Sequence, residues 1–191
     1  MTTHVSDQWK ASVVASVLVA LTMACAGPEG PAGPAGTGTS SPALVTAYGT
    51  GPLVIDESVF GYAAIPGLSA SVTVPSGSTE SVLIETDGGV QLNSADPAAS
   101  GFIDVAVFVD GAQVGAGRRV SVSNNGIVLY SVGSFGFSVQ TSLSAGAHAI
   151  TVMAKRFPVT LTDLYVSSAA SGSGLPGNPR LQGILNVIAF P

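Results

Sequence analysis

The residue best suited to acid–base chemistry is His148, the single histidine in residues 25–191. It alternates with Ile150 and Val152, so period-two counting puts the three side chains on one face of a predicted strand. A hydrolase would need a nucleophile, an orienting carboxylate and an oxyanion hole beside that imidazole. The sequence has no Gly-x-Ser-x-Gly elbow to supply them. Between a catalytic base and a hydrogen-bonded structural residue, the pattern favours the structural role. We predict no catalytic residues and a protein that is not an enzyme.

Metal ligands are few. One histidine and no cysteine in residues 43–191 exclude the usual structural zinc sets. Asp56, Glu57 and Asp87 are carboxylates in predicted loops, and calcium takes such oxygen ligands. The alternative, which we favour, is that they are solvated turn residues. We predict neither a metal site nor a cofactor.

Groups that could hold a ligand are also sparse. The only tryptophan, Trp9, stands near the N-terminus, and the tyrosines and phenylalanines further on are expected in the core or at a subunit interface. The tyrosines are Tyr48, Tyr62, Tyr130 and Tyr165. Arg118-Arg119 and Lys155-Arg156 are basic pairs that can bind an anionic surface, but the interpretation we favour is that they are solvated strand ends. A net charge of −5 argues against a nucleic-acid partner.

The elements that must position these residues are strands. Only 9% of residues are charged, against about 25% in an average domain, while valine, serine, threonine and glycine are abundant. Alternating or apolar segments separated by turn signals recur from residue 43 to the end, and Asp110-Gly111 is a two-residue hairpin signal. The segments cover residues 70–74, 80–86, 102–110, 119–123, 127–132, 135–143, 147–157, 161–166 and 181–190. With no helical crossovers, we predict an all-β, antiparallel, jelly-roll-like β-sandwich over residues 43–191.

The N-terminal residues resemble an export signal. Residues 11–24 are a run of apolar and small side chains, too short to span a bilayer, that ends in Leu21-Thr22-Met23-Ala24-Cys25. This ending resembles the lipobox of bacterial lipoproteins, although Leu21 stands one place earlier than the family prefers. The resemblance implies a signal peptide over residues 1–24, lipidation of Cys25, and an exported protein anchored to a bacterial membrane or cell surface. An ordinary cleaved signal and an uncleaved hydrophobic tail are the alternatives.

A glycine repeat follows Cys25. Gly27, Gly30, Gly33 and Gly36 are spaced by three, and proline follows each of the first three. A collagen triple helix needs glycine at every third position because no other residue fits at its axis. The stretch resembles bacterial collagen-like proteins, which join such a run to a C-terminal head. Residues 25–42 are therefore predicted to be a lipidated stalk and linker, either a stiff spacer or a short triple helix.

Two functions remain open. A collagen-like stub before a β head is similar to complement-type and tumour-necrosis-factor-like heads, and this resemblance implies a homotrimer. The C-terminal strand is apolar on both faces, so Ile184, Ile188 and Phe190 are candidate interface residues. The first function is a lipid-anchored, structural or adhesive cell-surface protein with a trimeric head. The alternative is a monomeric extracellular module that binds a carbohydrate or another surface ligand.

Overall fold

The computed structural model describes residues 41–94, 96–124, 130–157, 163–167 and 181–191. These residues belong to one compact unit, Ser40–Pro191. The predicted lipidation site Cys25 and the glycines of the collagen-like stub, Gly27, Gly30, Gly33 and Gly36, lie outside the described residues. Within the described ranges, no helix is long and apolar enough to cross a membrane.

The described residues form eight strands, all paired antiparallel, and no α-helix. The strands are β1 (Ala43–Tyr48), β2 (Leu53–Ile55), β3 (Ala63–Asn93), β4 (Ser100–Val109), β5 (Ala112–Ser123), β6 (Tyr130–Arg156), β7 (Leu164–Val166) and β8 (Ile184–Phe190). They follow the order β1-β8-β3-β6-β4-β5, with β7 joining β3 and β2 joining β7. This confirms the predicted all-β, antiparallel class.

Strands β3 and β6 are long because they form one ribbon that folds over on itself. Residues 79–93 of β3 pair with residues 130–144 of β6, and residues 63–74 pair with residues 146–154. The register of β3 against β6 shifts where these two parts meet, between Val74 and Thr79. Gly77 (φ 79°) and Gly146 (φ 139°) supply the left-handed backbone at this bend, which side chains other than glycine rarely adopt.

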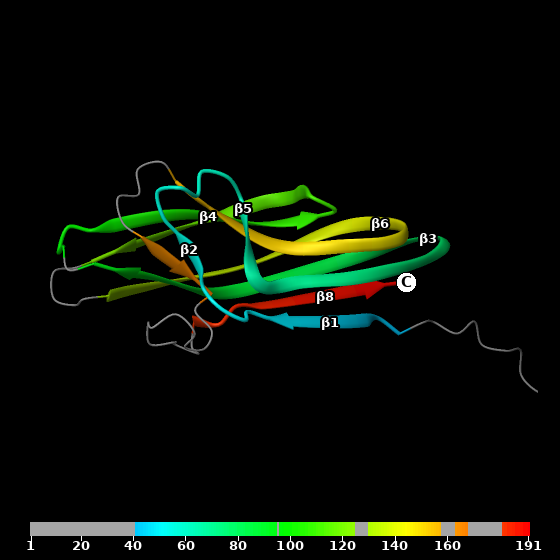
Figure 1. Cartoon of the computed structure of the whole chain (residues 1–191). Coiled ribbons are helices and arrows are strands. Elements are labelled where there is room, and N and C mark those ends of the chain that lie inside the picture. Colours follow the sequence, from blue (N-terminus) through cyan, green and yellow to red (C-terminus); the bar gives the residue numbers. More distant parts are fainter. Residues whose placement is uncertain (1–40, 95, 125–129, 158–162, 168–180) are drawn as a thin grey trace, which may run out of the picture. The chain divides into compact units, whose positions relative to one another are not determined.

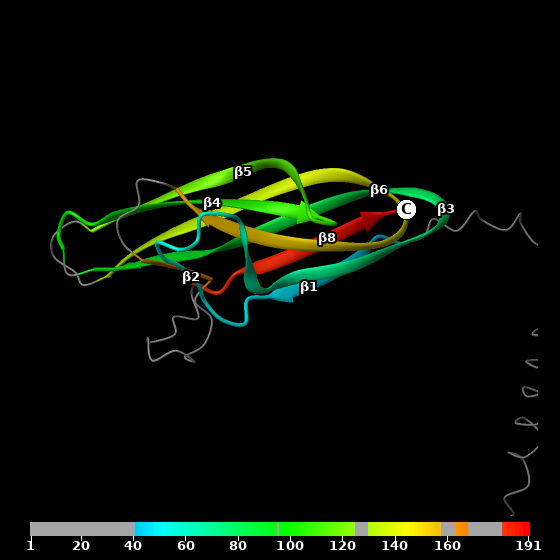
Figure 2. The ribbon, with the colours of Figure 1, turned by 45° about the horizontal axis from the view of Figure 1, so that its top comes forward.

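The bend produces the two layers of a sandwich (Figure 1; Figure 2). The β8 layer holds β1, β8, residues 79–93 of β3 and residues 130–144 of β6. The β4 layer holds residues 63–74 of β3, residues 146–156 of β6, β4 and β5. The predicted jelly-roll-like sandwich is thus made from a single hydrogen-bonded sheet.

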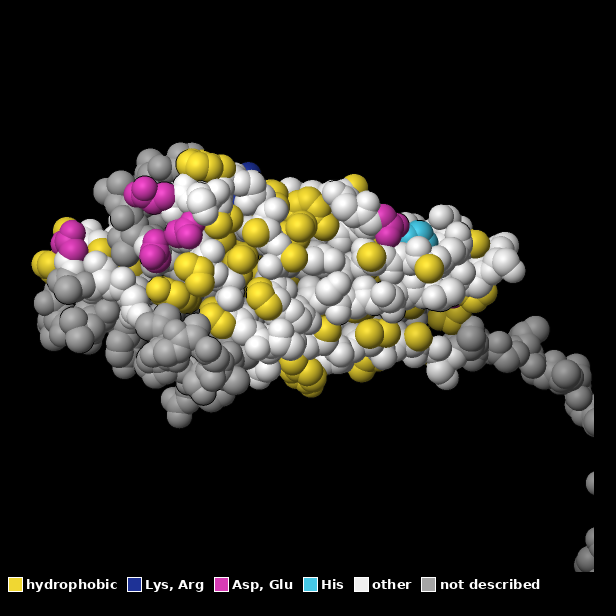
Figure 3. Space-filling view, viewed as in Figure 1, with side chains coloured by type: hydrophobic (Ala, Val, Ile, Leu, Met, Phe, Trp, Pro, Cys, Tyr) yellow, Lys and Arg dark blue, Asp and Glu magenta, His cyan; other side chains and the backbone are white. Residues whose placement is uncertain are grey.

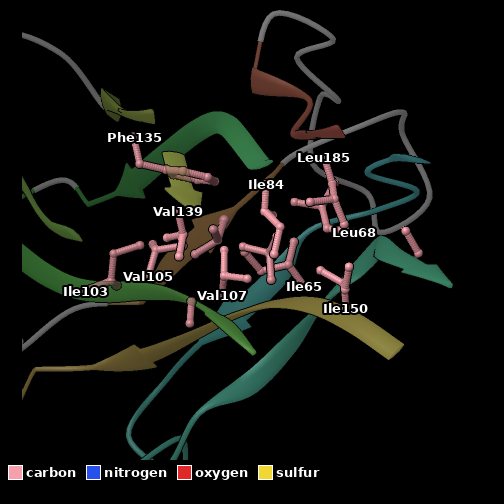
Figure 4. Close-up of a cluster of buried hydrophobic side chains, with 14 of the residues drawn as sticks. Ile65, Leu68, Ile84, Ile103, Val105, Val107, Phe135, Val139, Ile150 and Leu185 are labelled. Carbon is pink, nitrogen blue, oxygen red and sulfur yellow. The ribbon is translucent and has the colours of Figure 1, made fainter. Parts of the chain in front are cut away.

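The core lies between the layers and is almost entirely aliphatic (Figure 4). Ile84 and Leu185 come from the β8 layer, Ile103 and Ile150 come from the β4 layer, and none of the four is exposed to solvent. Each such side chain contributes about 1.5–3 kcal/mol when it is fully buried. Most interior positions alternate with outward-facing ones along the strands, and the interior face of β3 also buries the polar residues Glu80 and Thr86.

Gly88 and Gly89, which follow the predicted segment 80–86 and the predicted loop residue Asp87, lie inside a strand. Asp87-Gly88-Gly89 continues β3, where Asp87 pairs with Gly136 on one side and Ile184 on the other. A Cβ on Gly88 would stand 2.6 Å from Phe135 Cζ, and one on Gly89 would stand 2.6 Å from Leu181 Cβ. Glycine is therefore needed at both positions so that Phe135 and Leu181 can pack closely against β3. The sequence Gly-Gly alone does not distinguish this role from a turn.

The strand count also differs from the nine segments predicted. The ribbon fold joins five predicted segments into β3 and β6, while β1 and β2 come before the first predicted strand. The Asp110-Gly111 hairpin is confirmed. Both residues have positive φ, 51° and 81°, and they connect β4 to β5 in the two-residue turn that matches strand twist.

Candidate functional site

Aromatic and charged side chains gather on the outer face of the β4 layer. Asp104 of β4 is opposite Arg119 of β5 on one side and Lys155 of β6 on the other, so the three residues form one cross-strand row. Four rings surround the row: Tyr62, Phe102, Phe108 and Phe157, all half-buried. We call these seven residues the aromatic–cation face.

The rings of this face form two edge-to-face pairs. Tyr62 and Phe108 have centroids 4.9 Å apart, and Phe102 and Phe157 have centroids 6.1 Å apart. Both pairs have an interplanar angle of 65°. Such geometry adds about 0.5–1.5 kcal/mol per pair beyond burial of area.

Each ring pair also contacts one cation. The Arg119 guanidinium carbon lies 3.8 Å from the centroid of Phe157. The Lys155 ammonium lies 4.7 Å from the centroid of Tyr62. Ring quadrupoles attract cations at these distances. The cations are therefore held over the rings rather than extended into solvent.

Asp104 fixes the guanidinium of Arg119. Arg119 Nε donates to Asp104 Oδ1 at 2.8 Å, and Nη2 donates to Oδ2 at 3.1 Å. This hydrogen bonding raises the pKa of Arg119 above its usual value. Burial, with the Asp104 charge second, raises the pKa of Tyr62. The raised pKa values keep Arg119 charged and Tyr62 a neutral phenol at neutral pH.

Such a face is suited to binding a ligand. The Arg119 side chain remains 52% exposed, so its remaining N–H groups are accessible to a ligand. Half-buried rings offer apolar surface for the C–H face of a flat ligand. The only described histidine, which would be the natural general base, is far along β6 and bonded elsewhere.

His148 is held in a hydrogen-bonded position, as predicted for a structural residue. Nδ1 lies 2.7 Å from Asp110 Oδ2, and Nε2 lies 2.8 Å from the carbonyl oxygen of Ser144. The hydrogen bond to the Asp110 carboxylate, followed by that to the Ser144 carbonyl, raises the pKa of His148. In Figure 3 the histidine side chain (cyan) lies directly beside an acidic one (magenta). Neither ring nitrogen is left to take a proton from a substrate.

The three carboxylates considered for calcium do not form a site. Asp56 accepts hydrogen bonds from the hydroxyl and the amide of Ser58, which lower its pKa, and Glu57 is exposed. Asp87 is in the middle of β3 rather than in a loop. Among the residues that the structure describes, no three His, Cys, Asp or Glu side chains are grouped to hold a metal ion.

The proposed interface residues face outward from β8. Ile184 and Ile188 are half-buried and Phe190 is 41% exposed, whereas Leu185, Val187 and Ala189 are buried in the core. Strand β8 is not at the edge of the sheet, because β1 covers one side and β3 the other. Contact with another subunit would therefore use the outer face of the β8 layer.

Sequence reasoning missed the aromatic–cation face for an identifiable reason. Alternation along β4 already placed Asp104 and Phe108 on one face. Their partners Arg119 and Lys155 come from strands whose pairing the sequence does not reveal. The sequence predicts that the rings lie in the core or at a subunit interface. Phe135 is in the core, with 3% exposure, whereas the four rings of this face are half-buried on the outside of the sheet.

Comparisons with known proteins add little. No family model and no curated protein matches the sequence. A solved family 35 carbohydrate-binding module from Paenibacillus barcinonensis aligns over 66% of this chain and 99% of its own, with 13% identity and a TM-score of 0.24. Another, from an environmental isolate, aligns over 72% and 93%, with 16% identity and a TM-score of 0.25. TM-scores this low do not bear on the ligand of this chain.

Proposed function

We propose that the sandwich is a non-catalytic binding module whose ligand, a carbohydrate, lies on the aromatic–cation face. One observation carries the proposal: two ring pairs, each in contact with a cation, flank a single carboxylate on an open sheet face. Sugar rings combine an apolar C–H face with hydroxyl groups that both donate and accept hydrogen bonds. The aromatic rings pack against the apolar C–H face of the sugar, while Arg119 and Asp104 hydrogen-bond to its hydroxyl groups.

A glycan-binding screen with the full-length protein tests this proposal. We expect binding to at least one oligosaccharide, weakened by Phe157→Ala. The matched control is Tyr48→Ala, because Tyr48 is an exposed aromatic on the β8 layer, 55% accessible. A screen without any bound glycan, or equal weakening by both substitutions, would contradict the proposal.

The second candidate is the head of a lipid-anchored, trimeric structural or adhesive protein at the cell surface. It is favoured by the outer face of the β8 layer, where Leu44, Ile188 and Leu83 form a cross-strand apolar row. Leu44 is 64% exposed. In this proposal the signal peptide, the lipid on Cys25 and the stalk position the head outside the cell. Light scattering distinguishes the candidates: a trimer that Ile188→Lys converts to a folded monomer supports the second one.

A further inference from the structure

The imidazole of His148 contacts only hydrogen-bond acceptors. Nδ1 faces a carboxylate oxygen of Asp110 at 2.7 Å, and Nε2 faces the carbonyl oxygen of Ser144 at 2.8 Å. A carbonyl oxygen and an ionised carboxylate can only accept. Both contacts are hydrogen bonds at once only if both ring nitrogens carry a proton, which makes the ring an imidazolium.

These bonds connect separate parts of the fold. Asp110 is the first residue of the β4–β5 turn, and its Oδ1 also accepts the amide of Ala149 at 2.8 Å. Ser144 stands where β6 bends from one layer into the other, two residues before Gly146. The His148 side chain is only 13% exposed, so water replaces these partners poorly. The ring therefore ties the tip of the β4–β5 hairpin to the bend of the ribbon.

Few other charges face this ring. Across the ribbon, β3 offers Val72 as the register partner of His148, and residues 68–79 contain no titratable side chain. Residues 106–117 contain only Asp110, and residues 141–154 contain only His148 itself. Beyond the bend, β3 contributes Glu80, which is opposite Leu143 and buried. Asp110 is thus the charged group that governs protonation of His148.

We propose that His148 is a proton-controlled latch that holds the β4–β5 turn against the bend of β6. A neutral imidazole has one N–H, so loss of the proton removes the hydrogen bond to Asp110 or the one to Ser144. The turn then keeps only one of the two imidazole hydrogen bonds. It also keeps the bond from the Ala149 amide to Asp110 Oδ1 and the bond from the Asp110 amide to the Ala149 carbonyl at 2.9 Å.

The pH range follows from the direction of the shifts. The pKa of His148 is raised above 6.5, mainly by the hydrogen bond to Asp110. Its stabilising effect is therefore complete below about pH 6.5 and is lost as the pH rises through the folded-state pKa. The pKa of Asp110 is lowered below 3.8, mainly by the hydrogen bond from His148. The stabilising effect of the Asp110 carboxylate is therefore lost only as the pH falls through this lowered folded-state pKa. The latch is closed between these two pKa values.

Thermal unfolding of the full chain between pH 5.5 and 9.5 tests the latch, with His148→Gln as the matched control. Glutamine donates hydrogen bonds but does not titrate, and the variant leaves every other titratable side chain of the chain unchanged. We expect the Tm of the wild type to fall relative to that of the variant as the pH rises above 6.5. Hydrogen-exchange protection of residues 110–112 should fall over the same range, whereas that of the bend at Gly77 should not.

Parallel pH profiles for the two proteins would overturn the proposal. If His148→Gln does not fold, NMR titration of the wild-type imidazole decides the question alone. A ring that carries both N–H protons above pH 6.5 supports the latch, and a neutral ring at pH 6.5 overturns it.

Discussion

Two glycines with the same backbone conformation should respond differently to alanine. Gly67 has φ 82° and Gly111 has φ 81°, both in the left-handed region. At Gly111 nothing lies within 4 Å of a built Cβ, so only the backbone term applies. That term is about 1–2 kcal/mol for a side chain in this conformation. Since 1 kcal/mol shifts Tm by about 2–4 °C in a domain of this size, Gly111→Ala should lower Tm by about 2–8 °C.

Gly67→Ala adds a steric cost to the same backbone term. Its Cβ would stand 2.6 Å from the amide nitrogen of Thr50 and would also clash with the carbonyl oxygen of Tyr48. Both atoms are backbone, and Thr50 donates to the carbonyl of Pro66 at 3.0 Å, so the chain after β1 must move. Overpacking costs about 1–3 kcal/mol, which brings the total to about 2–5 kcal/mol.

Urea unfolding measures both costs as midpoint shifts at constant slope. We expect Gly67→Ala to lose clearly more stability than Gly111→Ala. Equal losses, or a milder loss at Gly67, would show that Tyr48 and Thr50 do not approach Gly67 as closely as described, and would refute the reasoning.

Three further predictions concern the face, the core and the anchor. Phe157→Ala should weaken glycan affinity about two- to tenfold by calorimetry, because a ring contact contributes about 0.5–1.5 kcal/mol; unchanged affinity would contradict the assigned face. Leu185→Ala should cost about 2–5 kcal/mol in urea unfolding and Ile184→Ala less than half as much, since β8 buries only the first; similar costs would contradict the register. Cys25→Ala should move the protein from the membrane fraction to the soluble fraction, and a variant that stays membrane-bound would count against lipidation.

The sandwich could be predicted because short segments of the sequence carry the signals for its strands and turns. Alternation along β4 and the apolar run of β8, together with Asp110-Gly111, are enough to indicate antiparallel strands and one hairpin. The fold-over of the ribbon could not be predicted in this way. Pro75-Ser76-Gly77 predicts the end of a strand, whereas β3 keeps pairing with β6 on both sides of the bend because both strands turn together. The role of Gly88 and Gly89 could not be predicted for a similar reason, because it depends on close packing against Phe135 and Leu181, which are distant in the sequence.

The candidate site required pairing that no single segment contains. Arg119 and Lys155 are 36 residues apart in the numbering, and only the order β5-β4-β6 brings both beside Asp104. His148 was easier, because a lone histidine after a turn glycine and between apolar residues favours a structural role. The sequence identifies its partner Asp110 only as a hairpin residue. The contact between the two side chains joins residues from different strands, so it is seen only in the folded structure.

Chemical-shift mapping tests the central claim most directly. The isotopically labelled protein is titrated with the oligosaccharide that binds best in the glycan screen, and backbone and side-chain shifts are followed by NMR. The account predicts that the largest changes occur at Phe102, Asp104, Arg119, Lys155 and Phe157, with little change on β1 and β8. Changes centred on Leu44, Ile184 and Ile188 instead, or no saturable change with any oligosaccharide, would contradict it.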